Sequence, residues 1–128
     1  KVRAVTSNLE SVDSGVDLAT TVIFTDEPLV APSTPFKAVH LTEMRSAVNA
    51  VRALGSATTG GGLPPATWTD PSPAGVRVRA AHITELRTAL DAARNLLMLS
   101  PVAYTNATSG GVIPVHAIDF MEIRNGTK

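Results

Sequence analysis

The chain has 128 residues, the size of one ordinary domain, and its eleven lysines and arginines balance eleven aspartates and glutamates. It therefore lacks the basic excess that is typical of nucleic-acid-binding proteins. The sequence has no cysteine, which excludes disulfides and cysteine metal sites, and it has no apolar run of membrane-spanning length. Aromatic residues make up only 4 % of the chain, so we expect a core of small aliphatic side chains between closely packed helices.

The sequence contains a ten-residue pattern that occurs three times. The copies are residues 36–45, 78–87 and 115–124. A second pattern, an aromatic residue followed by Thr and then by Asp or Asn, precedes each copy. Its copies, which we call the first, second and third aromatic segments, are residues 24–26, 68–70 and 104–106. Two linked patterns that recur in the same order indicate an internal repeat.

Each ten-residue copy begins a predicted helix. Apolar residues from Leu41 to Val51 are spaced by 3, 4 and 3 residues, and the second copy shows the same spacing from Ile83 onward. Such spacing places apolar side chains on one face of an α-helix. The third copy leaves room for barely two helical turns before Asn125.

Glycine and proline indicate where these helices are expected to end. The first helix is expected to end at Gly55, because glycine commonly follows the last helical turn. The second is expected to end near Ser100, since Pro101 disfavours helical conformation in the residue before it. The intervening stretches are rich in Gly, Pro and Thr, so we expect turns and short extended segments rather than a large sheet.

These elements predict a mainly α fold in a single domain. We expect an array of three helical repeats, or four with a degenerate copy at residues 1–21, joined by the extended aromatic segments and by Gly/Pro-rich loops. The expected repeats are residues 22–65, 66–101 and 102–128, and residues 1–21 form a degenerate repeat or an N-terminal arm. The sequence leaves open whether the repeats close into a ring or stack linearly.

A glutamate and the residue three positions before it recur in every copy. The pairs are His40 and Glu43, His82 and Glu85, and Asp119 and Glu122. Because Asp is a favoured N-cap residue and Glu three residues later completes a capping box, we expect the first member of each pair at a helix start. The glutamates are then in the first turn. The alternative is a metal site, since two histidines and one carboxylate form a recognised ligand set if they converge. We favour capping and assign no metal or cofactor.

Each copy also carries one arginine and follows one aromatic residue. The arginines are Arg45, Arg87 and Arg124, and the aromatic residues are Phe24, Trp68 and Tyr104. We expect ion pairs, between Arg87 and Asp91 and between the arginines and the aspartates of neighbouring repeats. These aspartates are Asp26 and Asp70. We expect the rings to fill the space between helices. The alternatives are an anion or acidic-glycan site built from the arginines, and sugar stacking on the rings.

The sequence carries no motif for catalysis. It contains no nucleophile elbow, no His-Glu-x-x-His zinc motif and no phosphate-binding loop, so we expect that the chain is not an enzyme. Asn106 and Asn125 each begin an Asn-x-Thr tripeptide, which makes both of them candidate glycosylation sites.

The stretches Ala-Val-His-Leu-Thr-Glu-Met-Arg and Ala-Ala-His-Ile-Thr-Glu-Leu-Arg, at residues 38–45 and 80–87, resemble tandem repeats at the carboxyl ends of large secreted bacterial surface proteins. The resemblance covers residues 22–128, and this chain departs from it at Asp119 and at the long insertion of residues 56–65. A weaker similarity to S-layer homology domains implies binding to cell-wall polysaccharide. The Thr-Arg-Ala-Glu tetrapeptide of those domains is missing here.

The resemblance implies a non-catalytic repeat module, secreted or at the cell surface, that attaches or assembles a secreted bacterial protein. The alternatives are a cell-wall or other carbohydrate-binding module and an accessory domain of a secreted hydrolase. Expected partners are preceding domains of the same parent protein, like subunits or a cell-surface glycan, with no nucleic acid and no membrane span. Residues 16–25 are β-prone and poor in charge, which predicts self-association or docking through residues 1–25.

Overall fold

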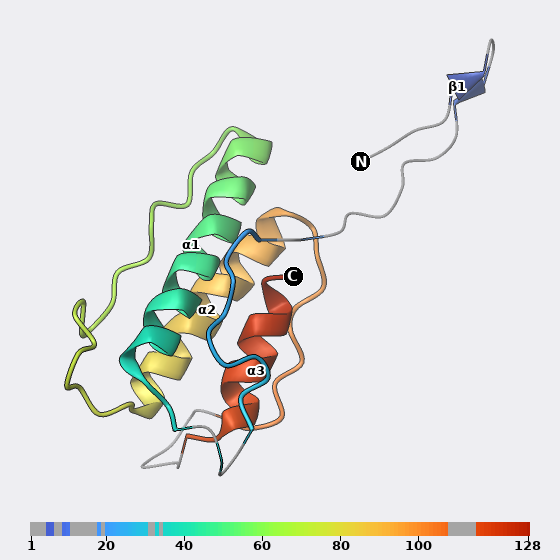
Figure 1. The fold of residues 1–128 in the computed structure, drawn as a ribbon. Coiled ribbons are helices and arrows are strands. Elements are labelled where there is room, and N and C mark those ends of the chain that lie inside the picture. The colour runs from blue at the N-terminus through green and yellow to red at the C-terminus, as the bar shows by residue number, and fades with distance from the viewer. Residues whose placement is uncertain are drawn as a thin grey trace.

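The structure, a computed structural model, is mainly helical (Figure 1). It describes residues 5–6, 9–10, 18, 20–30, 33, 35–107 and 115–128. The helices are α1 (Ala38–Thr59), α2 (Ala80–Leu96) and α3 (Ala117–Gly126). Two short strands, β1 (Val5–Thr6) and β2 (Leu9–Glu10), pair antiparallel, with Val5 opposite Glu10. The predicted mainly α class is confirmed, and no helix in the described part of the chain is long and apolar enough to cross a membrane.

The core lies between the three helices and is largely aliphatic, as the low aromatic content predicts. The apolar stripe of α1 is fully covered, since Leu41 is 1 % exposed and Met44, Val48 and Val51 are 0 % exposed. The stripe of α2 is covered in the same way, and Ile123 of α3 adds an aliphatic side chain that is 0 % exposed. The helix-period spacing therefore identified the buried faces of α1 and α2 correctly.

The first helix ends later than the sequence predicts, because Gly55 lies inside it. A Cβ atom at Gly55 would lie 3.4 Å from the carbonyl oxygen of Ala93 and 3.5 Å from Cβ of Leu96, so the absent side chain lets α1 approach α2 closely. The helix ends instead at Gly60, which has a φ of 68° and donates its N–H to the carbonyl of Ser56. The left-handed backbone, rather than the first glycine, determines the end of α1.

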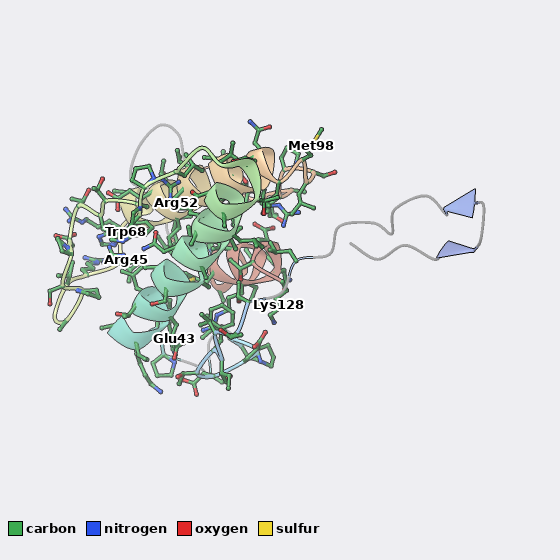
Figure 2. The ribbon with its side chains drawn as sticks, turned by 90° about the horizontal axis from the view of Figure 1, so that it is seen from above. Glu43, Arg45, Arg52, Trp68, Met98 and Lys128 are labelled. Atoms are coloured by element: carbon green, nitrogen blue, oxygen red, sulfur yellow. The ribbon has the colours of Figure 1, made fainter. Side chains whose placement is uncertain are left out.

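The second helix ends earlier than Ser100. Its last residue is Leu96, and Met98 adopts the left-handed region with a φ of 56°. The backbone N–H of Leu99 then donates to the carbonyl of Arg94 at 2.9 Å, which is the bond that closes a Schellman-type helix end. Met98 is 93 % exposed and projects from this turn (Figure 2). The turn is completed before Pro101, so proline does not act as the terminator.

Outside the helices, residues 20–30, 60–79 and 97–107 form no strand. The second and third aromatic segments lie along the outside of the helices and place a half-buried ring against them, whereas Phe24 of the first is only 5 % exposed. The third helix begins after residues that lie outside the described part of the chain.

Gly126, in the last turn of α3, tests how tightly this helix packs. A Cβ atom there would lie 2.6 Å from Cγ2 of Val102 and 2.8 Å from Cδ2 of Leu90. Gly126→Ala is therefore expected to lower the free energy of unfolding by about 1–3 kcal/mol, measured by urea denaturation. Gly61→Ala is the control, because nothing lies within 4 Å of its Cβ position. Equal stability of the two variants would contradict this packing.

Candidate functional site

The recurring histidine or aspartate lies at the third position of each helix, not at the N-cap. The N-cap of α1 is Lys37, whose backbone N–H donates to Nδ1 of His40 at 3.1 Å. The predicted position was wrong by three residues. A side-chain acceptor at the third position bonds back to the N-cap backbone, which is the reciprocal half of a capping box and stabilises the same helix start.

The other two helices begin in the same way. The N–H of Arg79 donates to Nδ1 of His82 at 3.2 Å, and the N–H of His116 donates to Oδ2 of Asp119 at 2.8 Å. The predicted N-cap positions of His82 and Asp119 are corrected accordingly. An imidazole nitrogen and a carboxylate oxygen are both acceptors, so either residue type caps the helix.

The second polar atom of each of these residues binds the preceding aromatic segment. Nε2 of His40 lies 3.1 Å from Oδ2 of Asp26, and Nε2 of His82 lies 2.7 Å from Oδ2 of Asp70. Because Nδ1 accepts a hydrogen bond, the ring proton must be on Nε2, which donates to the aspartate. In this arrangement each histidine joins a helix start to the segment before it.

We call the set of contacts between an aromatic segment and the helices a junction and number it after the segment. The third junction has the same geometry as the other two, but the hydrogen-bond donor and acceptor are reversed. Asp119 replaces the histidine, and its Oδ1 accepts a hydrogen bond from Nδ2 of Asn106 at 3.1 Å. A carboxylate cannot donate, so its partner must be a donor, and Asn106 supplies one where the other segments carry Asp. The departure at Asp119 is therefore matched by the departure at Asn106.

The three glutamates hold the threonines of the aromatic segments. Glu43 accepts from the backbone N–H of Thr25 at 2.9 Å and from its hydroxyl. Equivalent bonds join Glu85 to Thr69 and Glu122 to Thr105. The glutamates occupy the sixth helical position, so the expectation that they lie in the first turn was wrong. Their role is to bind a segment that comes from outside the helix.

The three arginines reach the next aromatic segment along the chain, and the last one reaches the first. Nη1 of Arg45 donates to the carbonyl of Asp70 at 2.6 Å. Nη1 of Arg87 donates to the carbonyl of Asn106 at 2.5 Å. The partners of the third arginine, Arg124, lie 98 and 99 residues before it in the sequence.

Arg124 of α3 binds the first aromatic segment, which lies between α3 and α1 (Figure 1). Its Nη1 donates to the carbonyl of Asp26 and its Nη2 to the carbonyl of Thr25, both at 3.1 Å. Arg124 is 2 % exposed, and burial lowers its pKa while Glu43, 3.9 Å away, raises it. The two ends of the described helical region are thereby joined.

Each guanidinium also covers one face of an aromatic ring. The guanidinium carbon of Arg45 lies 5.1 Å from the ring centre of Trp68, and the two side chains lie side by side (Figure 2). The corresponding distances are 4.3 Å from Arg87 to Tyr104 and 4.7 Å from Arg124 to Phe24. A cation over a ring face is a favourable electrostatic contact.

The ion pairs differ from those predicted. Arg87 pairs with Asp119 at 2.8 Å and with Glu122 at 3.6 Å, whereas Asp91 accepts a hydrogen bond from the hydroxyl of Tyr104 at 2.9 Å. The expected pair of Arg87 and Asp91 was therefore wrong. Arg45 and Arg124 do reach Asp70 and Asp26 of neighbouring segments, but they bind the backbone carbonyls of these residues instead of their carboxylates.

The metal alternative is wrong for the described residues. His40 binds Asp26, His82 binds Asp70 and Asp119 binds Arg87, so each takes a different partner. In the described ranges, no three His, Asp or Glu side chains are grouped so that they could hold a metal ion.

Sequence reasoning missed Arg52 and the groove beside it. Arg52 is 8 % exposed, donates from Nε and Nη2 to the carbonyl of Pro64 and from Nη1 to the carbonyl of Ala89. The groove, about 670 Å³ in volume, lies between residues 63–67 and α2. Its polar lining residues are Arg52, Thr67, Thr84, Glu85 and Thr88. The only sequence signal was an arginine one heptad after Arg45 on the same helix.

The two candidate glycosylation sites lie in different surroundings. Asn106 is half-buried and its amide donates to Asp119, so a glycan on that nitrogen would compete with the junction. Thr108 of the same tripeptide lies outside the described residues. Asn125 is exposed in α3, and its candidacy stays a prediction.

No protein-family model matches the chain, and no curated protein or solved structure matches it either.

Tyr104 gives a spectroscopic test of the third junction. Burial, then the hydrogen bond to Asp91, raises its pKa well above the ordinary value of 10.0. The unfolded chain therefore ionises first, and stability is expected to fall as pH rises above about 10. Tyr104 is the single tyrosine, so tyrosinate absorbance reports it alone. We expect ionisation only together with unfolding, and earlier ionisation in Asp91→Asn. Titration of the folded chain near pH 10 would contradict the burial.

Acid pH tests the second junction. The hydrogen bond from His82, then that from Arg79, lowers the pKa of Asp70 below 3.8. A lowered pKa stabilises the fold above the ordinary value, and this stability is lost as pH falls through and below 3.8. Asp70→Asn is therefore expected to give a shallower loss of melting temperature between about pH 5 and pH 2. Identical acid profiles for the variant and the parent chain would show that the junction does not bind a carboxylate.

Proposed function

We propose that the chain is a non-catalytic module of three helical repeats that close into a ring, and that it attaches or assembles a secreted bacterial surface protein. The observation that carries the proposal is the contact of Arg124 with the first aromatic segment. It repeats the contacts of Arg45 and Arg87 with the second and third segments. A closed set of equivalent contacts favours a ring over a linear stack.

The proposed repeats are residues 22–65, 66–101 and 102–128, each with one aromatic segment and one helix. Most of the degenerate fourth copy at residues 1–21 lies outside the described residues, and its positions 5–6 and 9–10 form β1 and β2 rather than part of a helix. Closure supports a count of three, because the site on α3 that a further repeat would use is filled by the first aromatic segment.

A non-catalytic role is supported by how the polar side chains are used. The histidines, glutamates and arginines of the repeated pattern bind backbone or side-chain groups of the aromatic segments. Groups that hold neighbouring repeats together in this way are not available to a substrate. The resemblance to carboxyl-terminal repeats of secreted bacterial proteins supports a location outside the cell. Its proposed partners are preceding domains of the parent protein, like subunits or a surface glycan.

Carbohydrate binding is the second candidate, and the groove beside α2 favours it. Thr67, Thr84 and Thr88 line the groove, and their hydroxyl groups can form hydrogen bonds with sugar hydroxyls. The aromatic rings are less suitable for stacking, because an arginine covers one face of each. A role as an accessory domain of a secreted hydrolase rests on the resemblance alone.

Attachment and self-assembly are tested with the full chain. We expect it to co-sediment with purified bacterial cell-wall material, or to form oligomers in sedimentation velocity, and to show no turnover with glycoside, peptide and ester substrates. Thr88→Arg fills the groove from an exposed position, and Asn95→Arg adds the same charge elsewhere on α2. Loss of wall binding in Thr88→Arg alone would assign that binding to the groove. Turnover of any substrate, or neither wall binding nor oligomers, would overturn the proposed function.

A further inference from the structure

The first aromatic segment is tethered differently from the other two. The second segment lies between α1 and α2 in the chain and the third lies between α2 and α3, so covalent connections hold both at the helices they join. The first segment precedes α1 and meets α3, the last helix (Figure 1). Its contact with α3 is therefore held by non-covalent interactions alone.

The α1 side of this junction recognises two side chains of the segment. Glu43 accepts hydrogen bonds from the backbone N–H and the hydroxyl of Thr25. Lys37 and His40 bind the carboxylate of Asp26 at 2.8 and 3.1 Å. A threonine followed by an aspartate satisfies all of these groups, and an aspartate is required where two donors converge.

The α3 side recognises the backbone and the ring. Arg124 donates to the carbonyls of Thr25 and Asp26, and its guanidinium lies over Phe24. Lys128 lies 5.8 Å from the same ring and pairs with Glu27. Together the two helices bind an aromatic residue, a threonine and an aspartate that follow one another in the sequence, as a peptide-binding site does.

The segment lies on the outside of the helices. Within residues 20–27 only Phe24 is buried, and Ile23 is 90 % exposed. Phe36, two residues before α1, stacks on Phe120 of α3 with ring centres 4.0 Å apart, so the two sides of the junction also touch directly. The segment can therefore be replaced by an identical one without separating the helices.

We propose that the α3–α1 junction is a receptor for an aromatic–Thr–Asp segment, and that a second copy of this chain fills it by exchanging residues 22–27. The proposal rests on the self-assembly part of the proposed function and names the contact that carries it. The chain's own segment competes as a tethered ligand, whose effective concentration is on the order of millimolar. Exchanged dimers therefore form at high protein concentration, as on a crowded surface.

The test is complementation between two defective full-length chains. The segment-defective variant carries Phe24→Ala and Asp26→Ala, and its receptor is intact. The receptor-defective variant carries Arg124→Ala, and its segment is intact. In a mixed pair, the segment of the receptor-defective chain fills the receptor of the segment-defective chain. We expect native mass spectrometry of an equimolar mixture, one chain isotope-labelled, to show mixed dimers at about ten times the level of either like dimer.

The matched control makes the same changes at the second junction. Trp68→Ala with Asp70→Ala is mixed with Arg45→Ala, and no enrichment of mixed dimers is expected because α1 and α2 hold that segment covalently. If the alanine variants do not fold, milder substitutions replace them: Thr25→Val gives the segment-defective chain and Glu43→Gln gives the receptor-defective chain. Mixed dimers at only the statistical level, with circular dichroism showing folded chains, would overturn exchange.

Parallel sedimentation of the parent chain separates this proposal from the proposed function. Oligomers of the parent chain that persist in both variants would support self-assembly but exclude exchange. A second outcome is that the unmodified chain neither oligomerises nor binds cell walls while the two variants still form mixed dimers. That combination would support the receptor and reject the proposed function.

Discussion

The structure depends on a buried guanidinium that bridges a helix and the next aromatic segment. Arg45, Arg87 and Arg124 are 5 %, 6 % and 2 % exposed, and each satisfies a backbone carbonyl while lying over a ring. An extended segment against a helix leaves carbonyls without strand or helix partners, and an unpaired buried carbonyl is costly. The guanidinium is planar and carries several donors, so it can donate to such a carbonyl and cover a ring with one of its faces. The ammonium group of a lysine cannot do both.

The helix starts show how one backbone requirement determines the partner of a side chain. The third helical residue must offer an acceptor to the N-cap N–H, and its remaining polar atom then has a fixed role. In His40 that atom donates, so Asp26 is its partner, and in Asp119 it accepts, so Asn106 is its partner. An aspartate at both positions would place two carboxylates against each other. The variation between copies therefore preserves one geometry with reversed hydrogen-bond polarity.

The helices and their buried faces were predictable, because the helical spacing of apolar residues is visible in the sequence itself. The helix starts were placed three residues late, since an acceptor at the N-cap and one at the third position give similar patterns. A glycine such as Gly55 is typical of a helix end, and the close packing against Ala93 that keeps it inside α1 depends on the neighbouring helix. The targets of the arginines were missed for a further reason. They are backbone carbonyls, which every residue carries, so no side-chain pattern points to them.

The three junctions are unequal in charge, and this inequality indicates where the proposed ring is most easily opened. Among the described residues, Arg87 has two carboxylates within ion-pair distance, whereas Arg124 has one, Glu43 at 3.9 Å. Within the same residues, the buried Nε of each arginine and Nη2 of Arg45 have no hydrogen-bond partner, but the covalent chain holds the segment of Arg45 between α1 and α2. The junction of Arg124 combines weak ion pairing with no covalent tether to α3. We therefore expect the proposed ring to open at its first segment, where the groups that become exposed match those of a second copy.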